Sequence, residues 1–143
     1  MNLNSLYTEV IMEHNASKHN KKIIKDANII EDGHNPSCGD EIKLQLKLNK
    51  DNVIEDAAYV GVGCAISQAS TSIMIDLIKG KSVKEAKSLV NTFLGMIKSE
   101  ITDDKKLEVL DDALAFKNIS QMPSRVKCAV LAWHTLDECL KDK

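Results

Sequence analysis

The sequence predicts an α+β domain in which a small antiparallel β-sheet packs against several α-helices. Apolar and polar side chains alternate strictly over residues 41–50, as in a strand with one buried face. On both sides of the strand-forming region, apolar residues recur at the spacing of an α-helix. The chain has 143 residues, the usual size of one domain, so we expect a single domain over residues 1–143.

The first half of the chain predicts one helix followed by the sheet. Apolar residues at roughly helical spacing predict a helix over residues 3–18. Residues 21–32 hold four isoleucines without a clear period, and Gly33 with Asn35-Pro36 predicts a turn, so we expect a short strand and a loop here. Turn residues at 49–52 separate the strand at 41–50 from a second strand at 53–62. These two strands are expected to pair as an antiparallel hairpin.

The second half of the chain predicts helices. The pattern becomes helical after Gly63 and stops at Gly80. Ser82 and Glu85 match a capping box ahead of the next helix. Residues 102–116 predict a further helical stretch, and Pro123 is placed to open a last helix.

Composition and charge argue against a nucleic-acid-binding protein and against a membrane protein. Hydrophobic residues make up 43% and charged residues 28% of the chain, which is typical of a globular protein. The formal charge is −2 and no basic cluster is interleaved with aromatic residues, so no nucleic-acid partner is expected. No stretch approaches the ~20 consecutive apolar residues of a membrane span, and the N-terminus lacks the apolar core of a signal peptide. We therefore expect a cytoplasmic protein without membrane contact.

The four cysteines carry the question of function, because in a reducing compartment they are expected to be free, metal-bound or catalytic rather than paired. Cys38 and Asp40 flank a glycine on the turn before the best strand. Gly39 can adopt dihedral angles that bring the thiolate and the carboxylate to one side. Cys64 is expected at a helix N-terminus, where the helix dipole stabilises a thiolate.

Two further cysteines lie in the last predicted helix. At 100° per residue, Cys128 has a heading roughly opposite the stripe of Val126, Val130 and Trp133, so it is not expected to be a core thiol. The basic residues at positions 125 and 127 are expected to favour its ionised form. Cys139 lies eleven residues farther along, or ~16 Å at 1.5 Å per residue, so it cannot share a metal ion with Cys128. We interpret Cys139 as a buried structural thiol.

Three thiolates and one carboxylate, from Cys38, Asp40, Cys64 and Cys128, suit a tetrahedral zinc site with sulfur at ~2.3 Å and carboxylate oxygen at ~2.0–2.2 Å. Spacing alone leaves this assignment open. Cys38 and Cys64 are 26 residues apart and Cys64 and Cys128 are 64 apart, without the close Cys-x-x-Cys pairs of strong zinc motifs. The alternative is that these thiols are separate small buried hydrophobes.

None of the four histidines has a partner at the i+4 spacing of helical zinc motifs. His14, His19 and His134 are therefore interpreted as solvated or satisfied surface residues. His34 lies four residues before Cys38, and we interpret it as a polar turn residue rather than a ligand.

Three motifs together resemble the SufU/IscU (NifU N-terminal domain) superfamily of iron–sulfur cluster assembly proteins. They are Asn-Pro-Ser-Cys-Gly-Asp at 35–40, Gly-Val-Gly-Cys-Ala-Ile-Ser at 61–67 and Arg-Val-Lys-Cys-Ala at 125–129. The resemblance covers nearly the whole chain, and the three motifs in this order are much more specific than any one alone. It implies a SufE/NifU-like α+β fold.

Positions near the third cysteine separate the two branches of this superfamily. IscU-type scaffolds carry His immediately before the third cysteine, where this chain has Lys127. They also carry a Leu-Pro-Pro-Val-Lys chaperone motif, where this chain reads Gln-Met-Pro-Ser-Arg at 121–125. SufU-type members have an insertion between the second and third cysteines, consistent with the helical stretch at 102–116. All three differences favour a SufU-type protein.

The resemblance implies the site and the partners. Cys38, Asp40, Cys64 and Cys128 are then the zinc ligands, and Cys38 is the sulfur acceptor. The protein takes persulfide sulfur from a SufS-type cysteine desulfurase and passes it to downstream Suf cluster-assembly proteins. A zinc-bound thiolate is a weak nucleophile, and the family solution is that a desulfurase histidine replaces Cys38 on zinc and leaves the thiolate free. Zinc exchanges nitrogen and sulfur ligands with little geometric penalty.

Three other functions remain as alternatives. The same thiolates could hold iron or an iron–sulfur cluster on an IscU-like scaffold, although Lys127 argues against it. A zinc hydrolase needs an open coordination position, a water molecule and a general base, and no His/Glu pair in the sequence supplies the base. A zinc ion that only stabilises the fold is the third alternative.

Overall fold

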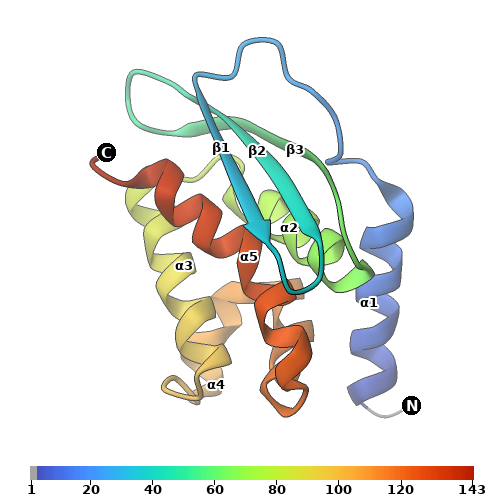
Figure 1. Cartoon of the computed structure of the whole chain (residues 1–143). Helices are drawn as coiled ribbons and strands as arrows, with labels where there is room; N and C mark the ends of the chain where they lie inside the picture. The colour runs from blue at the N-terminus through green and yellow to red at the C-terminus, as the bar shows by residue number, and fades with distance from the viewer. Residues whose placement is uncertain (1–2) are drawn as a thin grey trace.

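Helices cover one face of a three-stranded antiparallel sheet (Figure 1). The computed structural model describes residues 3–143, with side chains from Thr8 onward. The strands lie in the order β1-β2-β3, and helices α2 and α5 pack against them. The elements are α1 (Leu3–Ser17), β1 (Ile29–Asn35), β2 (Asp40–Leu48), β3 (Ile54–Val62), α2 (Ala65–Ile78), α3 (Val83–Ile97), α4 (Asp104–Leu107), the 3-10 helices η1 (Glu108–Phe116) and η2 (Ile119–Gln121), and α5 (Pro123–Leu140). The predicted α+β class is confirmed.

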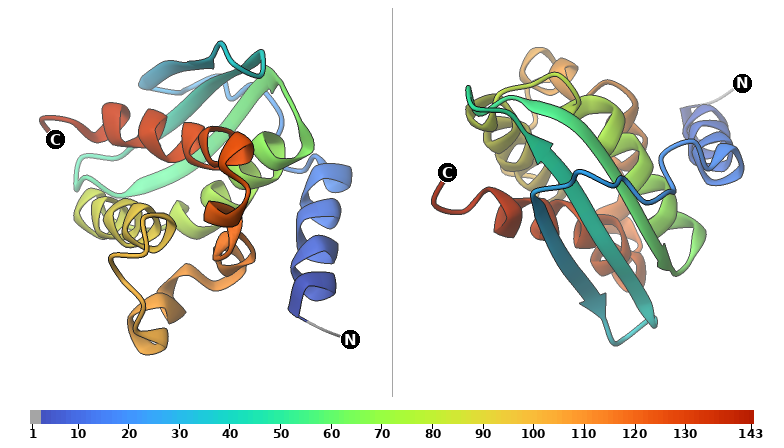
Figure 2. Two further views of the ribbon diagram at one scale, coloured as in Figure 1. Left: turned by 60° about the horizontal axis from the view of Figure 1, so that its bottom comes forward. Right: turned by 90° about the horizontal axis from the view of Figure 1, so that it is seen from above.

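The central strand β2 has the alternation that its sequence predicts. Ile42, Leu44 and Leu46 face the helices and are buried. Gln45 faces the other way yet is 2% exposed, because residues 18–28 cross the outer face of the sheet. Its side chain accepts a hydrogen bond from the Ile24 N–H at 2.9 Å and donates one to the Lys22 carbonyl at 2.9 Å. Figure 2 (right) shows this blue segment passing over the sheet before it enters β1.

Strand β1 begins later than the sequence predicts and continues through Gly33. Gly33 pairs with Ile42 inside the strand and is not part of the turn. A Cβ atom at this position would meet the Thr135 hydroxyl and the side chains of Ile42 and Leu131, so the missing side chain lets α5 approach the sheet. The turn itself comes after Asn35, because the Cys38 N–H donates to the Asn35 carbonyl at 3.3 Å.

Helices α2 and α5 are held in register by polar contacts inside the core. The Ser70 hydroxyl on α2 donates to the Ala129 carbonyl on α5 at 2.6 Å and accepts from the Trp133 indole at 3.1 Å. Phe93 on α3 stacks on the Trp133 ring at a centroid distance of 4.2 Å. These contacts fix the position of residue 128, which directly precedes Ala129.

The predicted helix boundaries agree well with the structure except in one segment. Ser82 and Glu85 form the expected capping box, and Pro123 is the first residue of α5. Residues 102–116 were expected to form a regular helical stretch, but only the short α4 is α-helical and η1 is a 3-10 helix. Asp111 interrupts η1 with a φ of 46°, which no helix accommodates. Among residues 3–143, no helix is both long enough and apolar enough to cross a membrane.

Candidate metal centre

The β1–β2 turn carries the first two candidate ligands at one end of the sheet. Asn35 and Asp40 form the last pair of the two strands, so the four residues between them make the turn. Gly39 has a φ of +69°, a left-handed conformation that glycine adopts without strain. This turn leaves Cys38 exposed while Asp40 is fully buried. The predicted role of Gly39 is confirmed.

Cys128 meets this turn from helix α5. Its Sγ lies 3.3 Å from the Sγ of Cys38, and it is fully buried. Among the described residues, Cys38, Asp40 and Cys128 form a group whose potential ligand atoms all lie within 4.8 Å of one another. Residues separated by up to 90 positions in the sequence are thus brought together by the packing of α5 against the sheet.

Cys64 reaches the same place from the start of α2, where it is the N-cap residue as predicted. Its N–H donates to Asp40 Oδ1 at 2.9 Å, so the carboxylate is already tied to this helix terminus. A Cβ atom on Gly63 would press against Asp40 Oδ1, so any larger residue here would force the buried carboxylate to shift. The Cys64 thiol stands outside the group of three, yet it is close enough to contribute to the pKa of Cys128.

The environment of Cys128 differs from the sequence prediction in two respects. Trp133 of the predicted stripe is fully buried and Val126 and Val130 are half-buried, but Cys128 on the opposite side of the helix is completely enclosed, so the expectation that it is not a core thiol is wrong. The nearby basic residues do not favour the thiolate. Burial raises the pKa of the Cys128 thiol far above its usual range, and contacts with Cys38, Asp40 and Cys64 raise it further.

Asn35 is a member of the site that sequence reasoning did not identify. Its side chain is buried, and its Nδ2 donates to Asp40 Oδ2 at 3.5 Å and to Cys128 Sγ at 3.9 Å. Its Oδ1 accepts from the Ser37 N–H at 3.3 Å, which holds the start of the turn. Asn35 therefore orients two candidate ligands and the turn at once. The Asn-Pro pair in the sequence was interpreted only as a turn signal.

The donor set fits a zinc ion. Two sulfurs bound at ~2.3 Å to a tetrahedral ion lie about 3.8 Å apart, close to the 3.3 Å between Cys38 and Cys128. Three sulfurs and one carboxylate oxygen complete four positions when Cys64 joins the group of three. Burial first, and then the neighbouring thiols and the carboxylate, raise the pKa of Cys128, and a divalent ion bound here would stabilise the deprotonated thiols.

The remaining cysteine and the nearest histidine stand apart from this centre. Cys139 is 3% exposed, and burial raises the pKa of its thiol to about 12, in agreement with the prediction of a buried structural residue. His34 is exposed, with its Nε2 3.7 Å from Glu41 Oε1, and it does not belong to the group of Cys38, Asp40 and Cys128. The interpretation of His14 as a surface residue is wrong, because His14 is 9% exposed and hydrogen-bonded to Ser72.

The fold and this cluster define a small α+β protein that gathers thiols and a carboxylate, candidate metal ligands, at one end of its sheet. The family described as the NifU-like N-terminal domain matches residues 6–142, and the chain belongs to this family. The resemblance seen in the three cysteine motifs is thereby confirmed.

Proteins of both branches of the superfamily are similar to this chain. The zinc-dependent sulfurtransferase SufU of Bacillus subtilis is 42% identical over 137 residues, 96% of this chain and 90% of that protein. The iron–sulfur cluster assembly scaffold protein IscU of Thermotoga maritima is 43% identical over 136 residues, 95% of this chain and 93% of that protein. A crystal structure of a putative iron–sulfur cluster assembly scaffold protein for the SUF system, from Fervidobacterium islandicum, superposes with a TM-score of 0.88 at 38% identity. It covers 96% of this chain and 98% of that one.

Proposed function

We propose that this protein is a zinc-dependent sulfur acceptor in iron–sulfur cluster assembly. In this proposal Cys38, Asp40, Cys64 and Cys128 hold the zinc ion, and Cys38 receives sulfur from a SufS-type cysteine desulfurase. Downstream Suf proteins then take the sulfur for cluster assembly. The observation that carries the proposal is the exposed Cys38 thiol, 3.3 Å from the buried Cys128 thiol and beside the buried Asp40 carboxylate.

Two of the four residues, Asp40 and Cys128, are fully buried, and Cys38 is accessible to a partner. Asp40 and Cys128 are fully buried and are held by Asn35, so they stay in place when the centre is approached. Cys38 lies on the turn, where a partner can reach its sulfur without unfolding any element. A zinc ion at this centre would keep the thiols deprotonated at neutral pH.

In this proposal a desulfurase histidine would first replace Cys38 on the zinc ion, and the transfer itself then needs only the freed Cys38 thiolate and the partner's persulfide. The Cys38 sulfur attacks the outer sulfur of the desulfurase persulfide and forms a new S–S bond. The S–S bond of the desulfurase persulfide breaks, and its cysteine leaves as a thiolate that takes up a proton. Sulfur is passed on without any change in the total number of electrons. The buried position of Cys128 excludes it as the acceptor, because a partner cannot reach it.

The test is a cysteine desulfurase assay in the presence of the zinc-loaded protein. Wild type is expected to raise the turnover of a cognate SufS-type desulfurase, and mass spectrometry should find one added sulfur on Cys38. Cys38→Ser is expected to lose both effects with the fold retained, since serine is nearly the same size. Ser37→Ala is the matched control, because Ser37 lies on the same exposed turn and carries no thiol. Equal stimulation by wild type and Cys38→Ser would refute the acceptor role.

An assembly scaffold is the second candidate function. It is favoured by the 43% identity to a protein named as an IscU scaffold, and thiolates are also ligands of iron–sulfur clusters. Iron and sulfide supplied anaerobically should then displace zinc and give a stable coloured cluster. Zinc opposes this exchange because a closed thiolate site binds it tightly. A stable cluster on zinc-loaded protein, with no persulfide on Cys38, would establish the scaffold and overturn the sulfur acceptor.

A further inference from the structure

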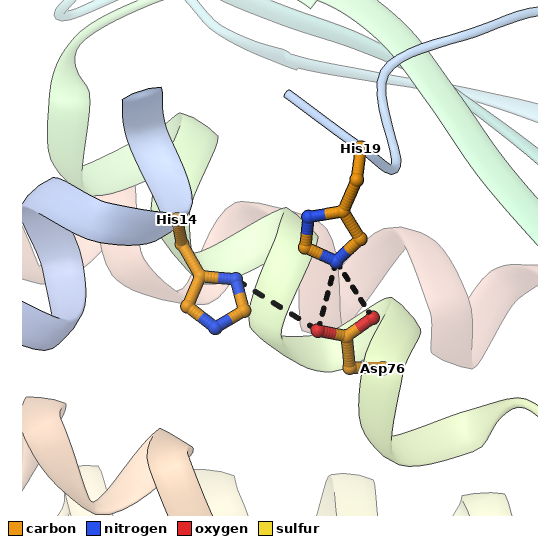
Figure 3. A group of neighbouring side chains, drawn as sticks. All are labelled: His14, His19 and Asp76. Atoms are coloured by element: carbon orange, nitrogen blue, oxygen red, sulfur yellow. Dashed lines mark hydrogen bonds and ion pairs between the residues drawn. The ribbon is translucent and has the colours of Figure 1, made fainter. Parts of the chain in front are cut away.

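A second group of metal-ligand side chains lies at the other end of helix α2 (Figure 3). His14 comes from α1, His19 from the segment that follows α1, and Asp76 from the last turn of α2. Asp76 is twelve residues beyond Cys64, which corresponds to about 18 Å along the helix at 1.5 Å per residue. The two groups therefore cannot share one ion.

The three side chains converge on one point. His19 Nε2 lies 3.1 Å from both oxygens of Asp76, and His14 Nδ1 lies 3.9 Å from Asp76 Oδ2. One potential ligand atom from each residue lies within 4.8 Å of the other two. Nitrogen and oxygen ligands bound to a tetrahedral zinc ion at ~2.0–2.1 Å are about 3.4 Å apart, so the observed distances bracket the required one.

Each histidine has a partner on its outer ring nitrogen. His14 Nε2 lies 3.5 Å from the carboxylate of Asp112 on η1, and His19 Nδ1 lies 2.8 Å from the Ser17 hydroxyl. With a proton on each outer nitrogen, the inner nitrogens, His14 Nδ1 and His19 Nε2, would each offer a lone pair to an ion bound beside Asp76. Metal-binding histidines commonly show this arrangement, in which a carboxylate or other acceptor orients the ring from behind.

The carboxylate of Asp76 is positioned by a buried amide. Asn20 is 0% exposed, and its Nδ2 donates to Asp76 Oδ1 at 2.9 Å and to the Ser72 carbonyl at 2.9 Å. The Ser72 hydroxyl lies 3.0 Å from His14 Nδ1 and is the group that a cation would displace from this lone pair. The Ser72 Oγ still accepts a hydrogen bond from Asn20 Nδ2 at 3.1 Å after that displacement. Exchange of the Ser72–His14 hydrogen bond for a metal bond thus leaves the Ser72 oxygen with a donor.

We propose that His14 Nδ1, His19 Nε2 and a carboxylate oxygen of Asp76 form a second binding site, for a divalent transition-metal ion of the zinc class. Two imidazoles and one carboxylate suit Zn²⁺, Ni²⁺ or Cu²⁺ rather than the oxygen-seeking Mg²⁺ and Ca²⁺. His14 anchors the site with a side chain that is 10% exposed, whereas His19 and Asp76 are 49% and 43% exposed. The ion is therefore open to water on one side and exchanges freely with solution.

The test counts zinc in the full-length protein by equilibrium dialysis against buffered free Zn²⁺, followed by elemental analysis. Wild type is expected to hold about one zinc per chain more than His19→Ala or Asp76→Asn under the same conditions. This difference does not depend on whether the cysteine centre is loaded. His134→Ala is the matched control, since His134 is exposed on α5 outside this group, and it should equal wild type.

Imidazole NMR identifies the ligand atoms. Addition of Zn²⁺ is expected to shift the Nδ1 resonance of His14 and the Nε2 resonance of His19, and to leave His34 and His134 unchanged. Asp112→Asn should keep the stoichiometry and lower the affinity for this zinc about 10- to 100-fold, because only the orienting contact is lost. Equal zinc content in wild type and His19→Ala, or no shift at His14 and His19, would overturn the site. Full retention of the zinc by Asp76→Asn would also overturn it, because the carboxylate would then not be a ligand.

Discussion

The two ends of helix α2 carry metal-ligand groups that differ in how they are built. At the N-terminal end, Cys64 joins the β1–β2 turn and helix α5, and two of the four side chains are fully buried. At the C-terminal end, Asp76 meets α1 and the segment after it, and only His14 is enclosed. The first group has two fully buried members beside the exposed Cys38, and the second has a single buried anchor.

This difference determines what each group can contribute. An ion bound at the cysteine group would link three distant segments of the chain, so its loss would destabilise the packing around it. An ion at the imidazole group would link α1 to α2 and leave the sheet untouched. The first group should therefore behave as a structural and chemical centre, and the second as an exchangeable site. The following predictions test that contrast, in order of decreasing effect.

The largest effect on zinc content and stability is expected at the buried thiol of Cys128. Cys128→Ser should lose about one zinc per chain and lower the melting temperature by about 10 °C, because ligand binding to the folded state alone stabilises it by ~4 kcal/mol at 1,000-fold excess over Kd. Cys139→Ser is the matched control, since it also replaces a buried thiol on α5 but should keep its zinc. Elemental analysis and calorimetry measure both quantities. Equal zinc in the two variants would remove Cys128 from the ligand set.

The next effect is expected at the carboxylate that joins the turn to α2. Asp40→Ala removes the acceptor of the Cys64 N–H, which is bonded at 2.9 Å, and should lower the free energy of unfolding by about 2–3 kcal/mol even without metal. Glu41→Ala changes an exposed carboxylate one residue away and should stay within about 0.5 kcal/mol of wild type. Chemical denaturation of the metal-free proteins measures this difference. If both variants unfold alike, Asp40 does not hold the helix terminus.

Glycines lie beyond both ends of α2, and replacing each with alanine should lower stability by a smaller amount. Gly63→Ala places a Cβ against Asp40 Oδ1, closer than van der Waals contact, so it should lower the free energy of unfolding by about 2 kcal/mol and weaken zinc binding at the cysteine centre. Gly80 has a φ of +83° with no atom within 4 Å of the added Cβ, so Gly80→Ala should cost only the backbone strain of about 1 kcal/mol. Zinc affinity should fall in the first variant alone. An equal loss of affinity in both variants would show that the change is not local.

The smallest effect is expected at the imidazole group. Free zinc at tenfold excess over the Kd of this site should add about 1.4 kcal/mol of stability, which is a rise in melting temperature of a few degrees. His19→Ala should abolish this second rise and keep the first, which belongs to the cysteine centre. Thermal unfolding at increasing free zinc resolves the two steps. A rise that persists in His19→Ala would assign the second ion to another place.

Local sequence signals predicted most of the fold. The alternation in β2, the capping box of Ser82 and Glu85, and Pro123 at the start of α5 each depend on neighbouring residues, and all three are confirmed. The 3-10 geometry of η1 and the place of Gly33 inside β1 depend on contacts with other elements. No local pattern could reveal them.

The two groups also differ in how far the sequence could predict them. The cysteine motifs were recognised through family resemblance, although the burial of Cys128 was missed because a helical wheel does not show which stripe faces the sheet. The imidazole group was missed because its members have no helical spacing and Asp76 lies 57 residues beyond His19. The packing of α1 and of the segment after it against α2 brings them together.

The segment that crosses the sheet also closes one of its edges. The Lys22 N–H donates to the Tyr59 carbonyl at 2.9 Å, and the Tyr59 N–H donates to the Asn20 carbonyl at 3.0 Å, so the middle of β3 already has its backbone partners. An edge strand that is covered in this way is a poor template for strand addition and self-association. Any molecule that adds a strand to β3 would first have to displace the segment that carries His19 and Asn20. An ion bound by His19 would fix that segment on β3 and so disfavour aggregation through this edge strand.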